Sequence, residues 1–283
     1  MAPTRVAPTA VPTPTTAASA TVAATLAPSP TTGPQPTSTA EALDPPELRA
    51  VWVDAFHDGF KTPAQVEEVT PEGGVMLDRT AFYPTGGGQP HDLGELRWDG
   101  GSAGVVEVRK SGAHVVHTLD AGPPPPGTRV HGEVDWERRY ALMRHHTALH
   151  SMSGVIYQLY GATVTGGQMY PDRARMDFLL PDLSQERLQE IEGRTNELLA
   201  EGHPVSIRFL SREEAFAIPD LIRTRVNLLP EGIEEIRVVN IEGIDQQADG
   251  GTHVGNTREV GRVRIARSEN KGKGNKRLEI VLE

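Results

Sequence analysis

Short runs of alternating apolar and polar residues fill the chain from Leu48 to about Val134, and glycine, proline or aspartate separates them. Alternation with a period of two is typical of strands that are buried on one face. We predict strands at Val51–Val53, Val75–Leu77, Val105–Val108, His114–Leu119 and Val130–Val134. Many short strands without an intervening helix predict an all-β, barrel-like first domain.

The pattern changes to a helical period after Trp136. Up to Tyr160, apolar residues recur at the spacing of a helix face, at Tyr140, Met143, Leu149, Met152, Ile156 and Leu159. This spacing predicts one long helix. Gly161 is suited to end it, because glycine readily adopts the left-handed conformation of helix C-termini.

Two more helices and several strands are predicted downstream. Ser184 caps a helix that runs to about Glu201 and stops at Gly202. Ser211 and Glu214 form the capping box of a short helix. Strands are predicted at Arg175–Leu180, Val205–Leu210, Glu235–Ile241, Arg258–Ala266 and Arg277–Leu282. We therefore expect an α+β protein, whose second domain has a mostly antiparallel sheet with helices to one side.

Composition divides the chain into three parts. Residues 1–45 are almost entirely Ala, Thr, Pro, Ser and Val, with Arg5 the first charge and Glu41 the next. Such a segment lacks the apolar surface that would offset its ordering entropy, so we expect a disordered tail or an overlong gene start rather than an Arg-rich transit peptide. The β-barrel domain then occupies residues 46–134, and the α+β domain residues 135–283. We expect a soluble, cytoplasmic protein, because no apolar run reaches membrane-spanning length.

The chain has no cysteine and a formal net charge of −10. The lack of cysteine excludes disulfides, thiolate nucleophiles and thiolate metal sites, so any metal must be held by His, Asp or Glu. The acidic balance argues against a broad nucleic-acid binder. A local basic stretch exists nonetheless between Arg258 and Arg277.

The first motif that suggests a chemical function lies on the long predicted helix. His146 and His150 are four residues apart, which places them one above the other on one helix face. Two imidazoles in this arrangement can bind one tetrahedral metal. A pair of this kind also arises by chance in a chain with ten histidines.

A second pair strengthens the metal hypothesis. Asp249 and His253 are also four residues apart, on either side of Gly250-Gly251. The glycines allow a sharp fold that brings both side chains to one point, although Asp-Gly-Gly is also an ordinary turn. Three histidines and one carboxylate make a ligand set suited to Zn²⁺.

These residues carry a family resemblance. Four segments appear in the family's order: Phe82–Gly94, His146–His150, Gly250–Val254 and Ser268–Arg277. Together they resemble the editing domain of alanyl-tRNA synthetases and its free-standing relatives, the AlaX trans-editing proteins. The size and the two-domain plan resemble the medium-length free-standing form.

The resemblance implies a zinc-dependent hydrolase that removes a wrong amino acid, serine or glycine, from tRNA for alanine. It assigns His146, His150 and His253 as zinc ligands. The best-known members have a cysteine at the fourth position, where this chain has Asp249. Asp249 either binds zinc directly or holds a water beside a three-His site. The zinc either activates water and polarises the carbonyl, or holds the substrate's amino group and hydroxyl.

Further site residues are expected around this centre. Glycines 86–88, with Gly87 and Gly88 at the catalytic position, allow close backbone approach to an oxyanion or the terminal ribose, unless they form only a flexible turn. Gln89 is the best side chain for orienting substrate or water. Thr165, which the resemblance favours, and Gln168 are predicted to bind the serine hydroxyl, although this stretch also reads as a plain polar loop. Lys271, Lys273, Lys276 and Arg277 are predicted to contact tRNA phosphates.

Three other functions compete with this one. The fold and the two-histidine motif are compatible with editing in the threonine system. A protein that binds tRNA but has lost catalysis is a second alternative, with Asp249 as its sign. A generic metallohydrolase is the third, and it would act on simple esters without tRNA. No protein partner is inferred.

Overall fold

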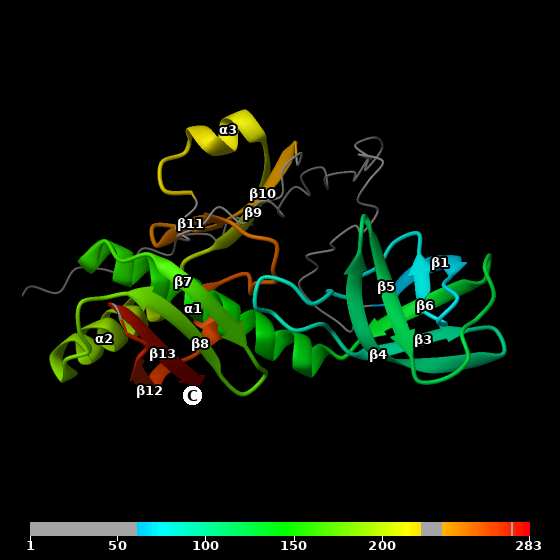
Figure 1. Ribbon diagram of the computed structural model, residues 1–283, viewed down its shortest axis with the longest axis horizontal. Coiled ribbons are helices and arrows are strands. Elements are labelled where there is room, and N and C mark those ends of the chain that lie inside the picture. Colours follow the sequence, from blue (N-terminus) through cyan, green and yellow to red (C-terminus); the bar gives the residue numbers. More distant parts are fainter. Residues whose placement is uncertain (1–60, 222–233, 273) are drawn as a thin grey trace, which may run out of the picture. The chain divides into compact units, whose positions relative to one another are not determined.

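The structure is a computed structural model that describes residues 61–221, 234–272 and 274–283 (Figure 1). The predicted tail at residues 1–45, the predicted strand Val51–Val53 and Lys273 lie outside these ranges. All described residues belong to one compact unit. None of the helices within these ranges is long and apolar enough to cross a membrane.

Six antiparallel strands close into a barrel in the order β1-β2-β5-β4-β3-β6. They are β1 (Lys61–Val69), β2 (Val75–Leu77), β3 (Gly94–Trp98), β4 (Gly101–Ser111), β5 (His114–Leu119) and β6 (Arg129–Val134). The predicted barrel-like architecture is confirmed, and β2 and β5 have the predicted bounds. The interior is filled by apolar side chains that include Val66, Leu96, Val108 and Val130.

The sequence did not predict β1 and β3, for a physical reason. Among the side chains whose burial is described, Val66 is the only buried one on β1 and Leu96 the only one on β3. The other apolar side chains that these strands pack against the core, Ala64, Val69 and Trp98, are only partly buried, and charged or polar residues separate them. Pairing with both neighbours in the closed barrel stabilises these strands instead.

The long helix α1 (Trp136–Tyr160) is confirmed at both ends. The Asp135 side chain accepts a hydrogen bond from the Arg138 amide, and Gly161 ends the helix at φ 62°. Almost every residue from Leu142 to Ile156 is buried. The helix therefore runs through the core and fixes the side chains it carries, including its histidines.

A four-stranded antiparallel sheet has the order β12-β13-β8-β7. Its strands are β7 (Val164–Met169), β8 (Ala174–Leu179), β12 (Val263–Asn270) and β13 (Asn275–Leu282). Alternate residues such as Phe178 and Leu278 pack in one core with α1 and with α2 (Gln185–Glu201). The side chains between them, such as Asp177 and Arg277, lie on the opposite face of the sheet.

A separate three-stranded antiparallel sheet, in the order β11-β10-β9, corrects the expectation of a single sheet. It consists of β9 (Val205–Ser211), β10 (Glu235–Ile241) and β11 (Asp245–Ala248). The short helix α3 (Arg212–Ala217) follows β9 and has the predicted Ser211–Glu214 capping box. Strand β11 was missed because its sequence, Asp-Gln-Gln-Ala, has almost no apolar residue.

The predicted strand Arg258–Ala266 is wrong in its first half. Residues Thr257–Val260 form a 3-10 turn, η1, and β12 begins only at Val263. The Asn256 side chain accepts a hydrogen bond from the Arg258 amide, and Glu259 completes a capping box. This local hydrogen bonding starts a helical turn where the alternation of residues indicates a strand.

A buried ion pair joins the segment after β2 to the start of α1. The Nε of Arg139 on α1 lies 3.0 Å from both carboxylate oxygens of Asp92, which is fully buried. Asp92 also accepts a hydrogen bond from the Tyr83 amide at 2.6 Å. The glycine-containing segment is thereby held against the helix that carries the histidine pair.

Candidate metal centre

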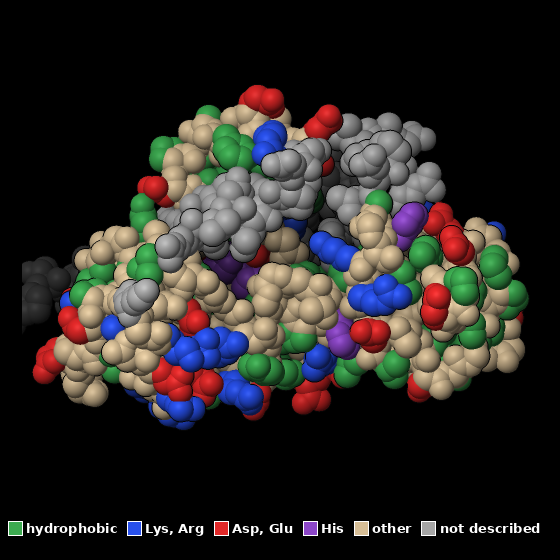
Figure 2. Space-filling model, viewed as in Figure 1, with side chains coloured by type: hydrophobic (Ala, Val, Ile, Leu, Met, Phe, Trp, Pro, Cys, Tyr) green, Lys and Arg blue, Asp and Glu red, His purple; other side chains and the backbone are tan. Residues whose placement is uncertain are grey.

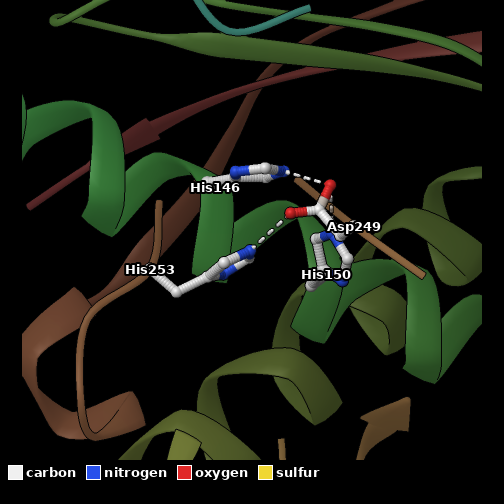
Figure 3. A group of neighbouring side chains, drawn as sticks. All are labelled: His146, His150, Asp249 and His253. Atoms are coloured by element: carbon white, nitrogen blue, oxygen red, sulfur yellow. Dashed lines mark hydrogen bonds and ion pairs between the residues drawn. The ribbon is translucent and has the colours of Figure 1, made fainter. Parts of the chain in front are cut away.

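Four side chains from two distant parts of the chain converge on one point (Figure 3). His146 and His150 project from successive turns of α1, whereas Asp249 and His253 come from the loop between β11 and η1. One donor atom from each residue lies within 4.8 Å of all the others. The structure therefore brings together all four predicted metal ligands.

The donor spacing suits a tetrahedral ion. Asp249 Oδ2 lies 3.1 Å from His253 Nε2, and Asp249 Oδ1 lies 3.6 Å from His146 Nε2 and 4.0 Å from His150 Nε2. Ligands at about 2.0–2.1 Å from a tetrahedral zinc are about 3.3 Å apart. Small side-chain movements bring the four donors to that spacing, so the residues fit a zinc ion.

The outer nitrogens of two histidines have fixed partners. His150 Nδ1 lies 2.9 Å from Asp245 Oδ2, an oxygen that also accepts a hydrogen bond from Gln247 at 2.8 Å. His253 Nδ1 lies 3.2 Å from the Thr147 hydroxyl. A proton on each Nδ1 leaves the Nε2 lone pair free for a metal, an arrangement that is common in metal sites.

Gly251 determines how closely the loop approaches the helix. A Cβ at this position would overlap the imidazole ring of His146, and it would come within 2.9 Å of Gln89 Oε1. Glycine is therefore required for close packing rather than only for a turn. The His146 Nδ1 is buried against this loop and has no hydrogen-bond partner in the described part of the chain.

Burial sets the charge state of the histidines. Desolvation lowers the pKa of His253, and it lowers the pKa of His146 well below the ordinary value. Both imidazoles are therefore neutral at pH 7, which is the form that binds metals. Burial alone would raise the pKa of Asp249, but the surrounding histidines outweigh it and keep this pKa well below its usual range.

Arg237 on β10 holds the loop at Asp249. Its Nη1 donates to the Asp249 carbonyl oxygen at 2.8 Å and lies 3.9 Å from Asp249 Oδ2. The Asp249 amide donates in turn to the Arg237 carbonyl oxygen at 3.2 Å. This double contact fixes the backbone at the residue that supplies the carboxylate.

The glycine segment, residues 86–89, lies directly beside the loop that carries Asp249 and His253, which we call the metal loop. Gln89 is fully buried; its Nε2 donates to the Thr252 hydroxyl at 2.9 Å, and its Oε1 accepts from the Thr252 amide at 3.1 Å. The Gly88 carbonyl oxygen accepts a hydrogen bond from the Met169 amide at 2.8 Å. Gly87 faces open space. The segment thus connects the metal loop to the end of β7.

The two residues predicted to bind the substrate hydroxyl have local partners. The Thr165 hydroxyl donates to Asn275 Oδ1 at 2.8 Å, and Gln168 Nε2 donates to the carbonyl oxygen of Met169 at 3.3 Å. Both lie on β7, so this stretch is a strand and the alternative of a plain polar loop is wrong. Neither side chain forms a hydrogen bond with the four metal-centre residues in the ranges described.

The residues predicted to contact tRNA differ in their availability. Lys276 is buried and donates to Asn270 Oδ1 at 3.0 Å, and Arg277 forms two 2.7 Å hydrogen bonds with Asp177. Lys271 is exposed, with its Nζ 4.0 Å from Glu269. Lys273 lies outside the described residues.

Sequence reasoning did not identify three residues that support the centre: Thr147, Arg237 and Asp245. A signal for two of them exists. Arg237 is a charge between the apolar residues Ile236 and Val238, and Asp245 precedes Asp249 by four residues. Their partners cannot be inferred from the sequence, because these partners lie on other elements.

Two protein-family models match parts of the chain. Residues 43–138 match the model described as tRNA synthetases class II (A). Residues 236–279, which include Asp249 and His253, match the threonyl and alanyl tRNA synthetase second additional domain.

Curated proteins match over much longer stretches. The alanyl-tRNA editing protein AlaX-M of Methanosarcina barkeri is 40% identical over 237 residues, which cover 82% of this chain and 97% of that protein. AlaX-M of Saccharolobus solfataricus is 41% identical, over 72% of this chain and 86% of that protein. The alanine–tRNA ligase of Thermoplasma acidophilum is 42% identical over 69% of this chain, but the match spans only 22% of the ligase. The chain belongs to the family of alanyl-tRNA editing proteins of the AlaX-M type.

Proposed function

We propose that this protein is a zinc-dependent deacylase that hydrolyses the ester between a wrong amino acid and tRNA for alanine, acting in trans. The observation that carries the proposal is the convergence of His146, His150, Asp249 and His253 next to the glycine segment. The relatives named as alanyl-tRNA editing proteins support the substrate class. The same relatives favour the alanine system over the threonine system.

We propose that His146, His150, His253 and Asp249 hold the zinc ion. When bound, zinc supplies Lewis acidity that stabilises the negative charge developing on the ester carbonyl. Asp245 and Thr147 keep a proton on the Nδ1 atoms of His150 and His253, which leaves their Nε2 atoms as donors. Arg237 holds the backbone of Asp249 and partly balances the charge of its carboxylate.

The glycine segment has a positioning role in this proposal. Gly87 and Gly88 have positive φ angles of 59° and 82°, and Gly87 faces open space. Their backbone can therefore approach the ester or the terminal ribose closely. Because both ends of its amide bind Thr252, Gln89 acts on the substrate through the metal loop; its direct contact with substrate or water stays a prediction.

The proposal also covers how the site distinguishes serine from alanine and which residues contact the tRNA. A buried polar group that bonds the serine hydroxyl rejects alanine more strongly than an apolar pocket does. Thr165 and Gln168 remain the proposed residues, and Lys271, Lys273, Lys276 and Arg277 the proposed phosphate contacts. We also propose a division into two domains. Residues 46–134 form the β-barrel domain that carries the glycine segment, and residues 135–283 form the editing domain.

The decisive experiment follows the loss of radiolabelled serine from seryl-tRNA for alanine, with alanyl-tRNA for alanine and seryl-tRNA for threonine as competing substrates. We expect rapid hydrolysis of the first substrate alone, and loss of this activity in His150→Ala. The control His203→Ala removes a histidine whose ring, within the described residues, forms a hydrogen bond with Glu201 alone. It is expected to keep full activity. Full retention of the ester at stoichiometric enzyme would overturn the proposal and favour a tRNA-binding protein without catalysis. Faster hydrolysis of seryl-tRNA for threonine would instead assign the protein to editing in the threonine system.

A further inference from the structure

The outer face of the four-stranded sheet carries charged side chains in an alternating arrangement. The register pairs Arg277 of β13 with Glu269 of β12 and with Asp177 of β8. In the next row it pairs Glu279 with Arg267 and with Arg175. Cross-strand partners lie on the same face of a sheet. The other face is covered by the core, so all six charges face away from α1.

A hollow of about 160 Å³ lies among these side chains and is lined by Tyr170, Arg173, Arg175, Arg267, Glu269, Arg277 and Glu279. One water occupies about 30 Å³ in the liquid, so the hollow has room for a group the size of a phosphate. Four arginines and two glutamates give its lining a net charge of +2. In a chain with a net charge of −10, this is a local reversal of sign.

Exposure differs among the ion pairs of this face: Asp172, which accepts two hydrogen bonds from Arg173, is 71% exposed against 41% for Arg173. The side chain of Arg267 is 67% exposed against 28% for Glu269. The side chain of Arg173 is 41% exposed against 28% for Glu279, and their closest atoms are 3.9 Å apart. An anion that approaches the hollow at Arg267 therefore meets the guanidinium group before the carboxylate of Glu269.

Arg175 occupies a special position in the hollow. It is half-buried, and within the described residues its guanidinium forms no hydrogen bond or ion pair. A guanidinium carries five N–H donors in a planar fork that suits two phosphate oxygens. Beside it, Arg173 stacks over the Tyr170 ring at 4.3 Å, which orients a second guanidinium and leaves an aromatic side chain at the edge.

The hollow is also connected to the metal centre. Met169 donates to the Gly88 carbonyl oxygen, and Tyr170, the next residue, lines the hollow. Met169, the last residue of β7, thus contacts the glycine segment, and the residue that follows it lines the hollow. Figure 2 shows the Lys and Arg side chains gathered with Asp and Glu where β8 and β13 lie.

We infer that this hollow is a phosphate-binding site for the backbone of an RNA strand whose 3′ end enters the metal centre. Arg175 and Arg173 make the contacts, and Arg267 supplies further positive charge at the rim. The choice of RNA as the source of the phosphate rests on the proposed function. The residues differ from the Lys271–Lys276 stretch, whose described lysines have acidic or amide partners.

The test measures binding of an uncharged RNA hairpin with a single-stranded CCA end, by fluorescence anisotropy over a range of salt concentrations. We expect Arg173→Gln/Arg175→Gln to weaken binding about tenfold at 0.1 M salt and to reduce the slope of log Kd against log salt by about 1–2. The matched control is Arg194→Gln, which removes an exposed arginine that is paired with Glu197 on α2 and should change neither value. Zinc content and the thermal midpoint confirm that the variants are folded.

The possible outcomes separate this inference from the proposed function. An unchanged salt slope in the double variant, or equal weakening in Arg194→Gln, overturns the phosphate site even if the protein hydrolyses seryl-tRNA. Binding that depends on Arg173 and Arg175 in a protein without hydrolytic activity supports the site and overturns only the deacylase. A rise in KM with unchanged kcat in an active double variant supports both.

Discussion

Gln89 and Thr252 are joined by two hydrogen bonds across 163 residues of sequence, and both are buried. Through this pair the glycine segment holds the loop that carries Asp249 and His253. The two hydrogen bonds use both the nitrogen and the oxygen of the Gln89 side-chain amide. This pair is one of the contacts by which residues outside the predicted ligand set hold this loop in place.

We expect Gln89→Leu to weaken zinc binding about 10–100-fold, as loss of an outer-sphere partner does. The variant leaves the Thr252 amide and hydroxyl buried without partners, which costs about 1–3 kcal/mol for each group. Competition with a chelator measures the affinity, and urea denaturation measures the stability. Gln168→Leu is the control, since among the described residues the Gln168 side chain forms a hydrogen bond with its neighbour Met169 alone. Unchanged zinc affinity in Gln89→Leu would show that the pair does not position the loop.

Asp245→Asn is expected to weaken zinc binding by a similar factor. The His150 Nδ1 proton then faces a neutral amide instead of a carboxylate, so the ring is a poorer donor at Nε2. The exposed Asp172→Asn removes the same charge at a distance from the centre and should leave the affinity unchanged. Equal affinities in the two variants would contradict the role given to Asp245.

Substitutions of Asp249 test whether its carboxylate binds zinc directly or holds a water molecule beside a three-histidine site. If the carboxylate binds zinc directly, Asp249→Cys keeps the metal and X-ray absorption detects a sulfur at about 2.3 Å. Asp249→Ala should then lose most of its zinc. A zinc site in Asp249→Cys that shows only nitrogen and oxygen neighbours would support the water-holding alternative.

Gly88→Ala is expected to be much more harmful than Gly87→Ala. Both glycines have positive φ, which costs about 1–2 kcal/mol for any other residue. A Cβ on Gly88 would also lie 2.5 Å from the Gly167 carbonyl oxygen, whereas a Cβ on Gly87 meets no atom within 4 Å. We expect the free energy of unfolding to fall by about 1–3 kcal/mol more in Gly88→Ala. Equal losses in denaturant titrations would mean that the contact with β7 is not tight.

Stability should decrease with acid because of His117 in the barrel. Burial lowers the pKa of His117 to about 4, and its ring nitrogens bond to Thr80 and to the Val75 carbonyl oxygen. The unfolded chain, with a pKa of about 6.5, binds this proton more readily. Its contribution is therefore complete above pH 6.5 and is lost as the pH falls towards 4, by up to about 3 kcal/mol.

The measurement is urea denaturation between pH 4 and pH 7. His117→Asn should lower the stability at pH 7 and flatten its pH dependence over this interval. The control His114→Asn replaces an exposed histidine on the same strand, β5, and should leave the slope unchanged. The same slope in all three proteins would show that His117 is not the group responsible.

Local sequence features determined much of this protein. The helical spacing between Trp136 and Tyr160, with Gly161 after it, defines α1, because a helix depends on neighbours three and four residues apart. The same rule places His146 and His150 on one face. The Asp249–His253 pair around two glycines is also local, so the four candidate ligands could be predicted from the sequence before their convergence was known.

The tertiary structure decided what depends on residues far apart in the chain. Strands β1, β3 and β11 bury too few apolar side chains to show a period, and they form because neighbouring strands pair with them. The pairing of Gln89 with Thr252, the support of His150 by Asp245, and the charged rows of the outer sheet all join separate elements. Sequence spacing carries no information about such contacts, since they exist only after the core has fixed which faces of the elements meet.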